Sequence, residues 1–68
     1  MAVSETYTVT GMTCAHCVQS VTDELLRLPG VHDVTVDLAS GSVTVESDGV
    51  VPLDEVRAAV DEAGYALT

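Results

Sequence analysis

Two segments with helical periodicity, each flanked by segments with strand periodicity, constrain the fold of this chain most. The first runs from about residue 15 to 28 and ends at Pro29-Gly30, and the second starts at Pro52 and ends at Gly64. Apolar residues recur in both at steps of three and four, which places them on one face of a helix. These apolar stripes are Val18, Val21, Leu25 and Leu28 in the first helix, and Leu53, Val56, Val60 and Ala63 in the second.

The remaining segments alternate apolar and polar residues, as half-buried strands do. The predicted strands cover residues 5–10, 31–38, 43–45 and 65–68, with a hairpin turn at 39–42. The order βαββαβ predicts an α+β fold, the split βαβ arrangement, in which two helices cover one face of a four-stranded antiparallel sheet. At 68 residues, the chain forms one domain, residues 1–68.

The acidic composition argues against several classes of partner. Eleven Asp and Glu residues oppose only Arg27 and Arg57, so the formal charge is −9, and the chain has no lysine. Binding to nucleic acid or to an anionic membrane needs Lys and Arg to neutralise phosphate groups, so we expect neither partner. An acidic surface keeps a small protein soluble, and it also steers docking onto a basic partner.

The sequence predicts a cytoplasmic protein without direct membrane insertion. No stretch has the length and apolar character of a transmembrane helix, and the first residues lack the features of a signal peptide. Cytoplasmic thiols are kept reduced, and a disulfide between Cys14 and Cys17 would close too short a loop to add much stability. The two cysteines are therefore better explained by metal binding or redox chemistry than by a structural role.

Both cysteines lie where the first strand leads into the first helix, in the run Gly11-Met12-Thr13-Cys14-Ala15-His16-Cys17. Unpaired N–H groups and the helix dipole stabilise negative charge at a helix N-terminus, and the thiolate is the form that binds metal. Two thiolates suit a soft ion with low coordination, and Cu(I) is such an ion. The sequence therefore predicts a Cu(I) site formed by Cys14 and Cys17.

Other metals and a redox function are the alternatives. Zinc prefers four ligands, for which His16, a water molecule or a carboxylate such as Asp61 are candidates, and mercury and cadmium are further possibilities. Structural zinc motifs pair one CxxC with a second Cys or His pair, whereas His32 stands alone. Thioredoxin-like oxidoreductases also place CxxC between a strand and a helix, but the Trp and Pro of their motif are missing here. We expect a carrier and not an enzyme.

The run Gly11–Cys17 matches the GMTCxxC signature of heavy-metal-associated domains, and Leu28-Pro29-Gly30-Val31 and Gly64-Tyr65 also resemble that family. The resemblance covers essentially the whole chain. Free-standing members of this length are bacterial CopZ-type copper chaperones, and the same module occurs in the N-terminal region of copper-transporting P-type ATPases. The resemblance implies a ferredoxin-like fold and Cu(I) bound linearly by Cys14 and Cys17. It also implies delivery to such an ATPase by ligand exchange through a shared three-coordinate intermediate.

Four further residues are candidates for supporting roles at this site. Met12 is either a thioether ligand or an anchor that packs inward, and Thr13 suits the helix N-cap. His16 either faces solvent, tunes the pKa of the flanking thiols, or supplies a third ligand in a copper-bridged homodimer. Tyr65 resembles the aromatic residue that bacterial members place beside the metal loop, and core packing is its alternative role.

The resemblance leaves three assignments open. A chain that opens at Met1 and ends soon after the fourth strand favours a free copper chaperone, whereas an ATPase domain would continue beyond Thr68. A mercury carrier of the periplasmic type would need a signal sequence. Eukaryotic chaperones have a lysine near the site and a basic docking face, and this chain has neither. We therefore expect the partner, the metal-binding domain or entry site of a copper-transporting P-type ATPase, to present basic residues.

Overall fold

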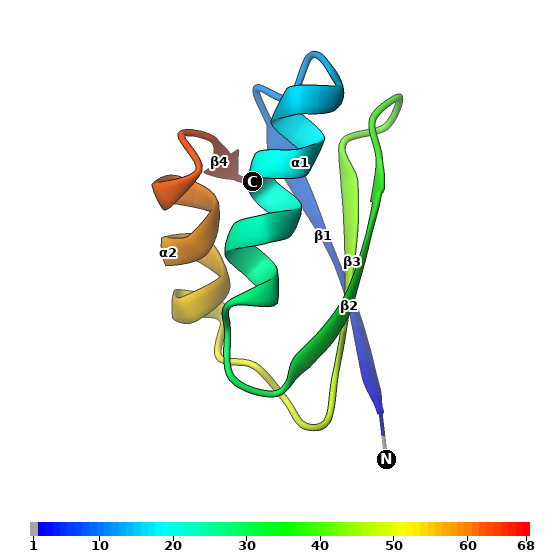
Figure 1. Ribbon diagram of the computed structural model, residues 1–68, viewed down its shortest axis with the longest axis vertical. Coiled ribbons are helices and arrows are strands. Elements are labelled where there is room, and N and C mark those ends of the chain that lie inside the picture. Colours follow the sequence, from blue (N-terminus) through cyan, green and yellow to red (C-terminus); the bar gives the residue numbers. More distant parts are fainter. Residues whose placement is uncertain (1) are drawn as a thin grey trace.

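The fold was obtained as a computed structural model that describes residues 2–68, and it confirms the predicted element order. The sheet has the strand order β2-β3-β1-β4, and each neighbouring pair is antiparallel. Both helices lie on the same face of this sheet, which gives the ferredoxin-like arrangement (Figure 1). The elements are β1 (Val3–Thr10), α1 (Ala15–Leu26), β2 (Val31–Asp37), β3 (Ser42–Ser47), α2 (Leu53–Glu62) and β4 (Ala66–Leu67).

The central strand β1 connects the two halves of the sheet. It pairs with β3 along most of its length, from Val3↔Ser47 to Thr8↔Ser42. Its pairing with β4 is short, with only Val9↔Leu67 and Thr10↔Ala66 in register. These last pairs hold the C-terminal segment of the chain beside the point where β1 ends.

The predicted last strand, residues 65–68, is shorter in the structure. The backbone N–H of Tyr65 donates to the carbonyl of Val60 at the end of α2, so Tyr65 takes no part in the sheet. Strand pairing therefore begins at Ala66, and a hydrogen bond from the Thr68 N–H to the Thr8 carbonyl extends the contact with β1.

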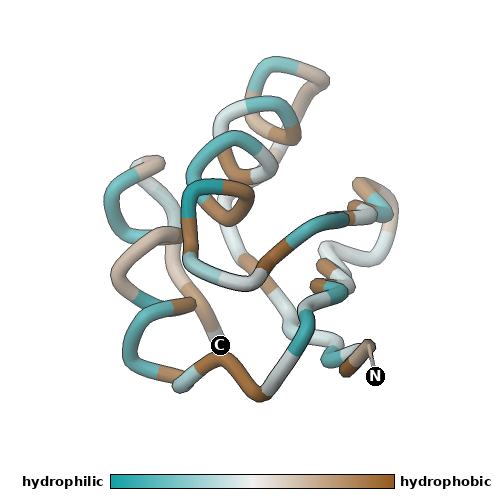
Figure 2. The backbone as a smooth tube through the Cα atoms, turned by 60° about the horizontal axis from the view of Figure 1, so that its bottom comes forward, coloured by the Kyte–Doolittle hydropathy of each residue, from teal (hydrophilic) through white to brown (hydrophobic). Residues whose placement is uncertain are grey.

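The core lies between the sheet and the two helices. Both helices are amphipathic, with hydrophobic and hydrophilic residues alternating around them (Figure 2). The largest side chains that are fully buried come from both helices and from β3. They are Leu25, Val21, Val43, Val45, Val56 and Val60. No helix within residues 2–68 is both long enough and apolar enough to cross a membrane.

The predicted apolar stripe of the first helix differs from the structure at both ends. In α1 the buried face consists of Cys17, Val21 and Leu25, and Val18 is only half-buried. The helix ends at Leu26 and not at residue 28, because the residue before a proline avoids the helical region and Leu28 precedes Pro29. Leu28 nevertheless packs against the core from outside the helix.

Leu53 and Leu38 are both exposed, although Leu53 was expected in the apolar stripe of the second helix and Leu38 in the strand over residues 31–38. Leu53 is 49% exposed and is the first residue of α2, whereas the buried face formed by Val56, Ala59 and Val60 begins one turn later. Leu38 is 40% exposed, because β2 ends at Asp37 and strand alternation stops there. The predicted Leu38 position on a strand face is therefore wrong, and Leu38 lies in the hairpin turn instead.

The adjacent leucines of α1 provide a test of this core. Leu25 is fully buried and Leu26 is 43% exposed, so we expect Leu25→Ala to lower the free energy of unfolding by about 2–5 kcal/mol. Leu26→Ala should change it by less than about 0.5 kcal/mol, as surface substitutions do. A chain of 68 residues has roughly 3–10 kcal/mol in total, so the first variant should lose a large fraction of its stability. Urea unfolding followed by circular dichroism measures both values, and equal losses would contradict the packing described here.

Candidate metal centre

The segment that leads from β1 into the first turn of α1, residues 11–17, carries both cysteines, and we refer to it as the thiol loop. It begins at Gly11, whose φ of 97° lies in the left-handed region that favours glycine. A Cβ atom at this position would lie 3.1 Å from Cδ1 of Tyr65. Gly11 therefore serves two purposes: it allows the turn after β1, and it leaves space for the tyrosine ring to lie against the loop.

Helix α1 begins at Ala15 as predicted, but its N-cap lies one residue later than predicted. Cys14, not Thr13, holds the N-cap position, with an extended backbone and no side-chain capping hydrogen bond. Its carbonyl accepts hydrogen bonds from the N–H groups of Cys17 and Val18, at 3.1 and 3.2 Å. The prediction for Thr13 as N-cap is wrong, and its hydroxyl oxygen lies 3.8 Å from the sulfur of Cys17 instead.

The two thiols are close together but differ in exposure. Their Sγ atoms lie 3.5 Å apart, and neither cysteine forms a disulfide. Cys14 is exposed at the tip of the loop, whereas Cys17 is buried, with 9% of its surface accessible. The reason is the helical face: Cys17 lies one turn before Val21 and two turns before Leu25 on the buried side of α1.

The surroundings of Cys17 favour its thiolate. A hydrogen bond from the backbone of Thr13 is the largest cause, followed by hydrogen bonds from the side chains of Tyr65 and Cys14, and together they lower the pKa of Cys17 to about 6. Burial acts in the opposite direction and is outweighed. Cys17 is therefore mostly a thiolate at neutral pH, the form in which a cysteine binds metal.

Tyr65 is positioned by the end of α2. Gly64 has a φ of 93° and donates its N–H to the carbonyl of Asp61, while the Tyr65 N–H donates to the carbonyl of Val60. This turn sends the half-buried Tyr65 ring towards the thiol loop. Its hydrogen bond to Cys17 is the largest cause of a raised Tyr65 pKa, with burial second. Tyr65 also packs against the core, so both roles expected for it describe the same side chain.

The other sequence candidates fall into two groups. Met12 is partly buried and packs against the core, as expected of a side chain that anchors the loop. His16 is exposed, and its carbonyl accepts a hydrogen bond from Ser20. Within residues 2–68, no group of three or more His, Cys, Asp or Glu side chains is arranged to hold a metal, so neither His16 nor Asp61 joins the two cysteines as a third ligand. His32 lies elsewhere, with its Nε2 3.3 Å from a carboxylate oxygen of Asp48.

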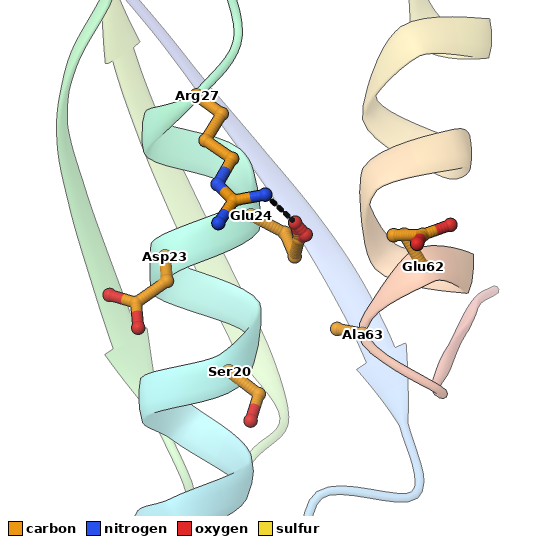
Figure 3. Close-up of a pocket in the computed structure, with 6 residues that line it drawn as sticks. All are labelled: Ser20, Asp23, Glu24, Arg27, Glu62 and Ala63. Atoms are coloured by element: carbon orange, nitrogen blue, oxygen red, sulfur yellow. Dashed lines mark ion pairs between the residues drawn. The ribbon is translucent and has the colours of Figure 1, made fainter.

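An acidic cleft between the helices was not predicted from the sequence. It has a volume of about 290 Å3 and is open to solvent. Figure 3 shows its lining, in which Arg27 turns back towards Glu24, with 3.3 Å between Nη1 and Oε1. The lining residues are Ser20, Asp23, Glu24, Arg27, Glu62 and Ala63. The cleft contains no thiol or imidazole, so it is not a second soft-metal site, but it gives the side of the helices a negative charge.

Comparison with known proteins gives results of three kinds. Residues 6–66 match the model of the heavy-metal-associated domain family. The chain is 39% identical over 66 residues to copper-transporting ATPase 2 of Rhizobium meliloti, a match that covers 97% of this chain but only 8% of that protein. It is 36% identical over 63 residues to the copper chaperone CopZ of Staphylococcus saprophyticus, covering 91% of this chain and 93% of that protein.

The similarity to these proteins extends to the three-dimensional structure. A solved structure described as a CopZ metallochaperone matches this fold with a TM-score of 0.90 at 31% sequence identity. The match covers 97% of this chain and all of that one. The chain is thus similar in length to the chaperone relatives and spans a small part of the ATPase relatives.

The hydrogen bond from Tyr65 can be tested through the titration of Cys17. In a Cys14→Ser background, where Cys17 is the one remaining thiol, we expect Tyr65→Phe to raise the pKa of Cys17 because the thiolate loses a hydrogen-bond donor. Tyr7→Phe is the matched control, since Tyr7 packs against the core and is not among the groups that shift the pKa of Cys17. Thiolate absorbance in the ultraviolet measures the titration, and an identical shift in both variants would contradict the described contact.

The same titration has a consequence for stability. The pKa of Cys17 is about 6 in the folded chain against an ordinary value of 9.0, so the unfolded chain binds more protons between these values. The contribution of Cys17 to stability is therefore fully present above about pH 9 and is lost as the pH falls towards 6. Cys17→Ser should remove this contribution to the pH dependence of the free energy of unfolding.

Proposed function

The chain belongs to the heavy-metal-associated domain family, and we propose that it is a cytoplasmic copper chaperone that carries one Cu(I) ion between Cys14 and Cys17. The observation that supports this proposal is the thiol pair itself. Its sulfur atoms lie 3.5 Å apart, one thiol is largely ionised at neutral pH, and the other is exposed. Two soft anionic ligands without a third protein ligand suit Cu(I) better than zinc, which usually takes four.

Transfer by ligand exchange fits the unequal exposure of the two cysteines. Cys17 is held by the core stripe of α1 and by Tyr65, so it remains the fixed ligand. Cys14 is open to solvent, so an incoming thiolate from the acceptor reaches the ion on that side and forms a three-coordinate intermediate. Cys14 then dissociates from the Cu(I) ion first, and Cys17 dissociates last. No bond to carbon or phosphorus changes, which is why we assign the chain a carrier role and not an enzymatic one.

The proposed acceptor is the metal-binding domain or entry site of a copper-transporting P-type ATPase. The identity to copper-transporting ATPase 2 of Rhizobium meliloti supports a link to such proteins. It also supports the alternative that this chain is the N-terminal metal-binding domain of an ATPase. The 36% identity to a CopZ chaperone supports the chaperone assignment. The same ligand exchange could join two copies of this chain. In such a homodimer the exposed Cys14 would share the copper ion, with His16 as a further ligand.

An anaerobic titration with Cu(I) in competition with a chromophoric chelator tests the proposal. We expect the reduced chain to retain about one copper ion per monomer, because two thiolates chelate a soft ion. Cys14→Ser/Cys17→Ser should retain none, and His16→Ala should match the unmodified chain in affinity and in oligomeric state by gel filtration.

Two outcomes would contradict this assignment. Zinc retained under conditions in which copper is lost would indicate a zinc carrier. A reversible Cys14–Cys17 disulfide without copper retention would indicate a redox protein.

The charge of the chain predicts how transfer depends on salt. With a formal charge of −9, this chain should be attracted by basic residues on the acceptor, so raising the ionic strength should slow transfer. Salt should lower the association rate constant, because charges outside the contact surface mainly affect how fast the two proteins meet. Stopped-flow transfer measured at increasing salt tests this expectation, and a rate that stays constant would rule out a basic acceptor.

A further inference from the structure

Few charged residues lie at the end of this acidic molecule that carries the thiols. Residues 6–22, which include the end of β1, the thiol loop and most of α1, contain no Asp, Glu, Lys or Arg. Residues 38–45, which include the turn between β2 and β3, contain none either. Of the eleven acidic residues, only Asp37, Asp61 and Glu62 lie at the ends of elements that reach this end of the fold.

The hairpin turn between β2 and β3, residues 38–41, lies at the same end as the thiol loop. Thr8 pairs with Ser42, so the turn extends past this pair to the level at which β1 ends. The N–H of Val9 donates to the carbonyl of Gly41 at 2.9 Å, two residues before the thiol loop begins. In Figure 1 the hairpin and the loop that precedes α1 lie together at the top of the long axis.

This hairpin exposes an apolar side chain. Leu38 is 40% exposed, and Ala39 beside it is exposed as well. A single exposed leucine is common on protein surfaces and by itself indicates nothing. The position of Leu38 matters because it shares this end of the molecule, with its few charged residues, with Cys14, the thiol that an acceptor has to approach.

The dimensions of the molecule make contact with the hairpin unavoidable for such an acceptor. The fold measures 32 × 19 × 19 Å, and the thiol loop lies at one end of the long axis. An interface at the lower bound of the standard size buries about 600 Å2 on each partner, a patch about 14 Å in radius. The end of this molecule has a half-width of only about 10 Å, half of the 19 Å extent. An acceptor seated over Cys14 therefore covers the hairpin too.

We propose that the β2–β3 hairpin, through Leu38, is the second half of the copper-transfer interface, and that the acceptor covers it with an uncharged, apolar surface. This inference rests on the proposed function and specifies the chemistry of the partner's contact. A charged group placed against Leu38 and the thiol loop would lose water without gaining a charged partner within residues 6–22 or 38–45, which opposes docking. Basic residues of the acceptor then lie at the rim, beside the acidic cleft between α1 and α2, as in interfaces with an apolar centre and a polar rim.

Charge substitutions at two exposed positions test the proposal. Val50 is 76% exposed in the loop between β3 and α2, at the opposite end of the molecule, and is the matched control for Leu38. The variants are Leu38→Asp, Leu38→Arg, Val50→Asp and Val50→Arg. The rate of Cu(I) transfer to the heavy-metal-associated domain of the copper-transporting ATPase of the same organism is measured for each. Cu(I) affinity is measured separately against the chelator.

Both Leu38 variants should transfer copper more slowly than the unmodified chain, by on the order of tenfold, because either sign of charge is unpaired in an apolar contact. Both Val50 variants should stay within roughly twofold, since their charges act only at long range. All four should keep the Cu(I) affinity of the unmodified chain, because neither position contacts the thiols.

Three results would overturn the inference. Equal rates for the Leu38 and Val50 variants would place the hairpin outside the interface. Faster transfer by Leu38→Asp together with slower transfer by Leu38→Arg would show a basic contact surface instead of an apolar one. An unmodified chain that binds copper but does not pass it to the domain would overturn the proposed transfer function itself, and this result is seen before any variant is made.

Discussion

The burial of Cys17 on the core face of α1 is the constraint on which the candidate site depends. Cys17 continues the stripe of Val21 and Leu25, so the packing that folds the helix onto the sheet also fixes one sulfur atom. Cys14 is the N-cap, where the backbone is still extended, and its thiol is therefore open to solvent. One helix start thus produces two thiols with opposite environments from two identical side chains. A carrier needs this asymmetry, because it has to hold its cargo and also release it to an acceptor.

The tertiary structure adds the group that tunes the buried thiol. Tyr65 is distant in sequence, and it reaches Cys17 because α2 ends at Gly64 and because β4 pairs with the end of β1. Gly11 leaves the space that the ring occupies. The helix start and Tyr65 together keep Cys17 ionised near neutral pH. The chain can therefore present a thiolate to a soft metal ion without any lysine or arginine beside the site.

The acidic residues that would attract a basic partner lie mostly outside the surface around Cys14 that the partner would contact. Most of the eleven acidic residues lie away from the thiol loop, and three of them line the cleft between the helices. In the proposed transfer, long-range attraction acts through these acidic residues, whereas residues 6–22 around Cys14 contain no Asp, Glu, Lys or Arg. Such a division increases the rate of encounter without a strongly charged contact that would have to be broken after transfer.

The sequence by itself determined the element order, the fold class and the position of the cysteine pair at a helix start. It did so because hydrophobic periodicity and the signals of Gly30, Pro52 and Gly64 are local. The ends of the stripes were predicted less well: Leu38 and Leu53 are exposed, and Cys14 replaces Thr13 as the N-cap. The step from Cys17 to Val21 to Leu25 was a signal in the sequence that could have identified the buried thiol.

Only the tertiary structure decided which residues surround the thiols. It placed Tyr65 and Thr13 at Cys17, left His16 in solvent, and brought the β2–β3 hairpin to the end that carries Cys14. These relations depend on strand pairing and helix packing between segments that are far apart in the chain. Local patterns specify which face of an element is buried, but the distances between elements follow from how those faces pack together.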